Sequence, residues 1–109
     1  LGSMSKRDKR EILSRLKVLL IHLLKWHYQP SQRSASWEVI LRNNREEIQQ
    51  ILTDSPSLKH YPALVLEQAY ASARNNAASE TGLPLSTFPE DCPFSVEMAL
   101  TDTFLDEGA

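Results

Sequence analysis

The stretch Val18-Leu19-Leu20-Ile21-His22-Leu23-Leu24 is the most apolar part of this chain of 109 residues. From Ile12 onward, leucine and isoleucine recur every three or four positions, which is the spacing of one helical face. Beyond Lys17 the apolar residues cover almost the whole circumference of such a helix, and a helix tolerates this only where neighbours enclose it. The pattern predicts a helix over Ser5–Tyr28 at the centre of the fold.

A second helix follows a proline. Pro30 ends the first helix because its ring cannot continue the hydrogen-bond ladder. The next helix begins near residues 33–36, where Ser34 or Ser36 can cap the free amides. The apolar face of this helix consists of Trp37, Ile40, Leu41, Ile48, Ile51 and Leu52. It is the clearest amphipathic helix in the sequence.

Serine, proline and glycine mark the limits of a third helix. Ser55-Pro56 places a capping serine before a proline at the first helical position, so we expect the helix to begin there. Pro62 lies inside the helical pattern and either kinks the helix or separates a short first turn. Gly82 follows the last helical residues and supplies a stop.

A proline-containing loop over residues 83–93 precedes a short last helix, which Ser95 caps and which extends to about Thr103. The fold class predicted for residues 1–109 is all-α: a single domain that forms a small up-and-down helical bundle, with three main helices plus a short C-terminal helix. The other predicted helices are too few to cover a central helix that is apolar on all sides. We expect that self-association, or a further helix upstream of Leu1, covers the exposed side.

Composition and length bound the class of protein. A content of 41% hydrophobic and 24% charged residues is typical of a folded globular domain. The apolar run is far shorter than the roughly 20 residues that cross a membrane, and no apolar signal region follows the start of the chain. The single cysteine, Cys92, forms no internal disulfide, which agrees with a reducing compartment. We expect a cytoplasmic protein that uses no membrane.

Positive and negative charges are segregated along the chain. Residues 1–45 hold ten Lys and Arg against three Asp and Glu, whereas residues 46–109 hold two against eleven. The basic stretch Lys6–Lys17 is a candidate nucleic-acid surface, and the same asymmetry also lets a basic helix pack beside acidic ones. A pI near 5.9 favours the second interpretation, because nucleic-acid-binding domains are strongly basic.

Motifs of enzymes and of cofactor sites are absent from the sequence. Three glycines cannot build a glycine-rich phosphate loop, and the acidic neighbour of Cys92 lowers the reactivity of the thiol. His22 and His27 are five residues apart, so they project in directions about 140° apart on a helix. We therefore expect no catalytic residue, no cofactor and no metal. The alternative is a metal-dependent helical-bundle enzyme that uses His22 with His60 or a nearby carboxylate.

Aromatic and polar side chains are concentrated between the first two predicted helices. Arg33 can stack on Trp26, Tyr28 or Trp37, which either fixes a packed corner or forms a recognition surface. The corner is the favoured interpretation, with partner binding at its exposed edge. The candidate interaction or structural motif consists of His22, Trp26, Tyr28, Pro30, Arg33, Ser34 and Trp37.

Several short motifs, in this order, resemble a known family. They are the string from His22 to Pro30 followed by Arg33, Ser34, Ser36 and Trp37, then Asp54 to Leu58, then Tyr70, Ala73 and Arg74, then Glu80 to Leu83, and finally Phe88-Pro89 and Cys92-Pro93. Together they cover nearly the whole chain and are similar to the bacterial domain of unknown function DUF29.

The resemblance implies a helical bundle and a further helical segment before Leu1. It implies no activity. In the family, His27 occupies a variable position, whereas the positions that match the family motif are His22, Trp26, Tyr28, Pro30, Arg33 and Trp37. Together with the residue patterns, it leads us to expect a non-enzymatic bacterial protein that self-associates as a homo-oligomer or binds another protein. We expect nucleic acid to be a poor partner, and the sequence indicates no small molecule.

Overall fold

The computed structural model describes residues 2–101, with side chains from residue 5 onward. The four helices are α1 (Gly2–Tyr28), α2 (Ala35–Asp54), α3 (Tyr61–Thr81) and α4 (Val96–Leu100), joined through 3₁₀ turns at Pro30–Gln32, Pro56–Leu58 and Leu85–Thr87. No strand occurs between residues 2 and 101. The predicted all-α bundle of three main helices and a short one is confirmed.

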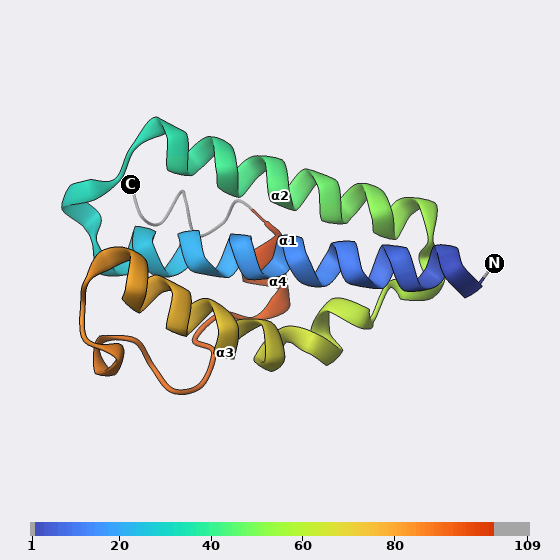
Figure 1. Ribbon diagram of the computed structural model, residues 1–109. Coiled ribbons are helices and arrows are strands. Elements are labelled where there is room, and N and C mark those ends of the chain that lie inside the picture. The colour runs from blue at the N-terminus through green and yellow to red at the C-terminus, as the bar shows by residue number, and fades with distance from the viewer. Residues whose placement is uncertain (1, 102–109) are drawn as a thin grey trace.

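The first helix lies between the other two long helices (Figure 1). α1 packs against α2 on one side and against α3 on the other, and α4 contacts all three. The chain runs up, down and up, so that α3 lies parallel to α1 and antiparallel to α2. The helix predicted to be central therefore holds the core together.

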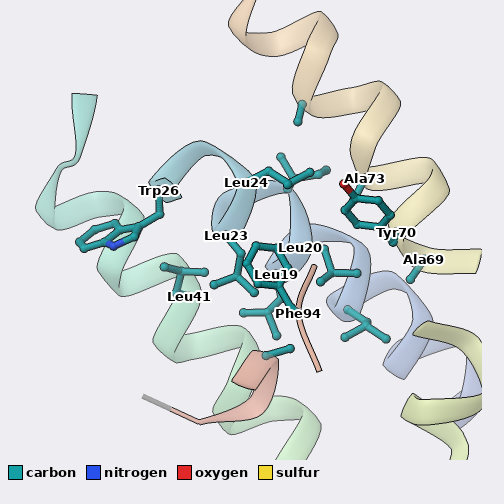
Figure 2. Packing of buried hydrophobic residues seen from close by; sticks show 14 of the residues in the cluster. Leu19, Leu20, Leu23, Leu24, Trp26, Leu41, Ala69, Tyr70, Ala73 and Phe94 are labelled. Carbon is teal, nitrogen blue, oxygen red and sulfur yellow. The ribbon is translucent and has the colours of Figure 1, made fainter. Parts of the chain in front are cut away.

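Most of the apolar stretch of α1 is enclosed by this chain itself, although Val18, its first residue, is 36% exposed. Leu16, Leu19, Leu20, Leu23 and Leu24 are all 0% exposed. Figure 2 shows the last four of them among Leu41 of α2, Tyr70 of α3 and Phe94 of the segment that leads to α4. The expectation that these elements are too few to cover the stretch is wrong. The central helix therefore gives no reason to add a further helix or a second copy.

The loop between α3 and α4 supplies the cover that the sequence patterns missed. Phe88 and Phe94 in this loop are 1% and 6% exposed, and Ala99 of α4 is fully buried. The loop is held by α3: the Tyr70 hydroxyl donates to the Pro89 carbonyl at 2.6 Å, and Arg74 Nε donates to the Phe88 carbonyl at 3.0 Å. Phenylalanines in a loop show no helical periodicity, which is why the sequence patterns did not predict that this loop covers α1.

Two helix starts differ from the predicted ones: α1 begins at Gly2, three residues before the predicted Ser5, and α3 begins later than predicted. The third helix does not begin at Ser55-Pro56, because Leu58 and Lys59 donate to carbonyls three residues earlier and close a separate 3₁₀ turn. α3 then begins at Tyr61 with Pro62 in its first turn, where a proline loses no hydrogen bond. Of the two outcomes considered for this proline, separation of a first turn is confirmed.

Capping residues set the start of α2, the end of α3 and the start of α4. The Ser34 hydroxyl accepts from the Trp37 amide at 3.3 Å, and the Ser95 hydroxyl accepts from the Met98 amide at 3.1 Å. Gly82 ends α3 with a φ of 75°, a conformation that favours glycine. α4 ends at Leu100, and Thr101 is already extended, so the helix is shorter than the predicted one, which continued to about Thr103; residues 102 and 103 lie outside the described residues.

Within residues 2–101, no helix combines the length and the apolar character that crossing a membrane requires.

Candidate functional site

A packed corner joins α1 to α2. Trp26 is 7% exposed, and the Arg33 guanidinium lies over its ring at 4.7 Å from the centroid. Arg33 Nε also donates to the Trp26 carbonyl at 2.9 Å, near the end of α1. A cation over an aromatic face contributes about 0.5–2 kcal/mol, and the hydrogen bond fixes its position. Of the three possible stacking partners, Trp26 is the one that Arg33 contacts.

The start of α2 completes this corner. Ser34 caps α2 through the Trp37 amide, and the Trp37 ring lies 5.9 Å from Lys25 Nζ. Lys25 also pairs with the Glu80 carboxylate of α3. Trp26, Arg33, Ser34 and Trp37 thus lie together and set the angle between two helices.

The remaining residues of the predicted motif lie elsewhere. His22 is half-buried, and its Nδ1 is 2.9 Å from the Val18 carbonyl, one turn earlier in α1. Pro30 is exposed in the 3₁₀ turn. Tyr28 contacts the Phe88 ring edge-on, with centroids 5.4 Å apart at 74°. The seven residues therefore do not form one site, and Tyr28 belongs to a different surface.

That surface is a cleft at the C-terminal end of α1, which we call the aromatic cleft. It is lined by His27, Tyr28, Pro93, Phe94 and Met98 and encloses about 360 Å³. The His27 and Phe94 rings lie 5.4 Å apart at 38°. Tyr28 is 36% exposed, so part of its ring is available to a partner. The walls are aromatic, apolar and in part flexible, because methionine adapts its shape to what it contacts.

Carboxylates lie close to this cleft in the sequence and in the fold. Glu90, Asp91 and Glu97 are exposed in the segment that carries Pro93 and Phe94, and residues 82–101 contain no lysine or arginine. Glu67 of α3 reaches the same loop, where its carboxylate accepts from the Cys92 amide at 3.3 Å. None of these four carboxylates forms an ion pair within the described part of the chain.

Two side chains with shifted pKa values, Tyr70 and Cys92, lie at the loop between α3 and α4, and both shifts indicate structural roles. Burial, together with nearby Cys92, raises the pKa of Tyr70 to about 12. Burial and the Glu67 carboxylate raise the pKa of Cys92 to about 11. A thiol with such a pKa is protonated at neutral pH and is a poor nucleophile. The low reactivity predicted for Cys92 thus has burial as its main cause.

The two histidines considered for a metal lie far apart. His60 precedes Tyr61, whose ring lies 5.6 Å from Lys9 Nζ, so His60 is at the end of α1 that carries Lys9. His22 is thirteen residues further along, which corresponds to about 20 Å of helix. Residues 2–101 contain no group of three or more His, Cys, Asp or Glu side chains placed to hold a metal ion.

A second, polar hollow of about 480 Å³ lies between α2 and α4. Its walls hold α4 in place: Arg45 Nε donates to the Ala99 carbonyl at 3.0 Å, and Gln49 Nε2 donates to the Leu100 carbonyl at 3.2 Å. Arg45 is 4% exposed. Sequence reasoning assigned no role to this arginine, because a charged residue on an amphipathic helix is normally solvated.

Sequence reasoning also missed most of the aromatic cleft. Pro93, Phe94 and Met98 come from the last quarter of the chain, and no periodicity connects them with the end of α1. The available signal was the presence of two phenylalanines beside prolines of this segment, Phe88 before Pro89 and Phe94 after Pro93.

Comparison with known proteins gives one match. The family model described as "Domain of unknown function DUF29" matches residues 1–105. No curated protein and no solved structure matches the chain.

Proposed function

This chain belongs to the DUF29 family, and from the surface described above we propose that it is a protein-interaction module. In this proposal the aromatic cleft binds an apolar side chain that lies on a positively charged segment of another protein. The observation that carries the proposal is the cleft itself: an aromatic hollow with exposed carboxylates around it and no lysine or arginine in residues 82–101.

The size and lining of the cleft support an anchoring role. Its volume of about 360 Å³ lies at the lower end of the roughly 300–1,000 Å³ of small-molecule pockets, so one large side chain fills much of it. Binding energy at protein interfaces is concentrated in a few anchors that fill such pockets, and aromatic side chains and methionine are enriched there. Tyr28 and Met98 supply that kind of wall.

The surrounding charges support the choice of partner. Glu67, Glu90, Asp91 and Glu97 are exposed and form no ion pair within residues 2–101, so they make a negative contribution to the field near the cleft. They outnumber Arg45 and Arg74, the two cations that bind carbonyls of the same segment. A negative field steers positively charged partners toward the surface and disfavours acidic ones. A basic segment with one large apolar residue fits both features.

The proposal includes a bacterial and cytoplasmic setting. Cys92 is half-buried and has no disulfide partner, which is compatible with a reducing compartment.

The experiment uses a fluorescent peptide of about ten residues with one central tryptophan and lysines on both sides. Fluorescence anisotropy measures the affinity of the full chain for this probe. We expect Met98→Lys to weaken binding at least tenfold, because it places a like charge in the cleft. Val39→Lys is the matched control, since it adds the same charge on an exposed position of α2 and is expected to leave the affinity unchanged.

Three results would overturn the proposal. The first is equal binding by the Met98→Lys and Val39→Lys variants. The second is equal binding of a probe with glutamates in place of the lysines. The third is displacement of the probe by a synthetic peptide of residues 102–109, which would make the chain's own segment the occupant. A circular dichroism spectrum of each variant checks that the helices are retained.

A further inference from the structure

A cluster of cations lies at the opposite end of α1 from the aromatic cleft. Lys6, Arg7, Lys9 and Arg10 are all exposed in the first turns of the helix. Arg10 and His27 are seventeen residues apart, which corresponds to about 25 Å of helix. The cations and the cleft are therefore two separate surfaces.

These cations are not neutralised within the described chain. The two ion pairs found there join Glu11 with Arg15 and Lys25 with Glu80. Asp8, the remaining acid in this part of α1, is half-buried and accepts from the Ser55 hydroxyl at 2.9 Å. Asp54, which precedes Ser55, accepts from the Gln50 amide, and a hydrogen bond from a neutral side chain leaves a carboxylate charged. The four cations outnumber these two carboxylates, so the field at this end of the molecule is positive.

Three of the cations follow one flank of the helix. With about 100° of rotation per residue, Lys6, Arg10 and Lys17 lie within about 40° of one another and extend over roughly 16 Å. Lys6 and Arg10 are exposed and Lys17 is half-buried. We call these three residues the basic stripe. Lys6 and Arg10 are one helical turn apart, and Lys17 follows Arg10 by two turns. The position between Arg10 and Lys17 on this flank is Leu13, which packs against the core. Acidic residues at the same one-turn and two-turn spacing on a second helix would face the three cations.

From this arrangement we infer that the basic stripe binds an acidic helical segment of a partner protein. The inference is independent of the aromatic cleft, because it involves other residues and because the partner is acidic, whereas the partner proposed for the cleft is basic.

Other polyanions fit the stripe less well. Single-stranded nucleic acid needs aromatic faces on which bases stack, and Tyr61, the aromatic residue closest to the cations, is half-buried with Lys9 over its ring. A long duplex would also extend toward the exposed carboxylates of a chain whose net charge is −2. A membrane surface needs an apolar helical face beside the cations, and Ile12 and Leu16 of α1 are buried in the core. A short acidic helix needs no stacking surface and no apolar face, and it is too short to reach the exposed carboxylates.

The test measures binding of the full chain to a fluorescent helical peptide with glutamates one turn apart on one face, and to its glutamine counterpart. We expect the chain to bind only the glutamate peptide, and the affinity to fall at least tenfold between 20 and 300 mM salt. Each exposed ion pair changes an association constant by about 1.4- to 5-fold, so the triple variant Lys6→Gln, Arg10→Gln, Lys17→Gln should bind about tenfold more weakly.

A pair of single variants separates the stripe from the overall charge. Arg10→Gln and Arg42→Gln each remove one exposed cation, and we expect only the first to weaken binding. Equal effects of the two would overturn the inference, as would binding of the glutamine peptide. Tighter binding of a duplex oligonucleotide or of anionic vesicles would also overturn it. Sedimentation of the chain alone tests whether a second copy is the partner. Self-association that the triple variant abolishes would show that the stripe binds another copy of this chain, and would overturn the inference.

Discussion

Truncation of Phe88 tests whether the loop between α3 and α4 covers the central helix. Phe88 is 1% exposed, and its ring meets the edge of the Tyr28 ring at the end of α1. Its carbonyl accepts from Arg74 Nε at 3.0 Å, a bond that Phe88→Ala leaves in place. The substitution therefore removes the side chain that fills the core without removing the backbone contact that positions the loop.

The expected loss follows from the buried volume. Truncating a buried phenylalanine to alanine costs about 3–5 kcal/mol, because transfer energy is lost and a cavity remains. The edge-on contact with Tyr28 is worth about 0.5–1.5 kcal/mol beyond area burial, which favours the upper part of that range. A domain of this size has a free energy of unfolding of about 5–15 kcal/mol. Phe88→Ala should therefore remove about a quarter or more of the free energy of unfolding.

Urea denaturation followed by circular dichroism measures this loss. With an m value of about 1–3 kcal/mol/M, the midpoint should fall by roughly 2 M. Leu85→Ala is the matched control in the same loop, where the side chain is 41% exposed, and should change the free energy of unfolding by less than about 1 kcal/mol. A loss below 1 kcal/mol for Phe88→Ala would refute the reasoning, because the central helix would then be covered by something other than this loop.

Three further predictions concern caps and titration. Ser34→Ala should lower the free energy of unfolding by about 1 kcal/mol in urea melts, since the cap of α2 is lost, whereas Ser36→Ala should have little effect. Because burial raises the pKa of Tyr70 to about 12, its stabilising contribution should be complete below pH 10 and fall as pH rises from 10 to 12; Tyr70→Phe should lack this decline. With a pKa of about 11, Cys92 should react slowly with a disulfide reagent at pH 8, and faster as pH approaches 11; a fast reaction at pH 8 would contradict the burial.

The helix limits on both sides of the corner between α1 and α2 could be predicted because their determinants are local. Pro30, Arg33, Ser34 and Trp37 lie within eight residues of one another, and proline geometry and serine capping act over that distance. The aromatic cleft was not predicted, because it joins the end of α1 to residues more than sixty positions later. Its formation depends on how Tyr70 and Arg74 hold the intervening loop, and no local pattern encodes that contact.

The sequence by itself determined the elements of this protein: helical periodicity, prolines, serine caps and one glycine mark where the helices begin and end, and the apolar stretch 18–24 identifies the central one. Only the tertiary structure decided what encloses that helix and which side chains form surfaces. Periodicity reports which residues of a helix are apolar, but the burial of Phe88 and Phe94 depends on a loop whose path is set by long-range hydrogen bonds and packing.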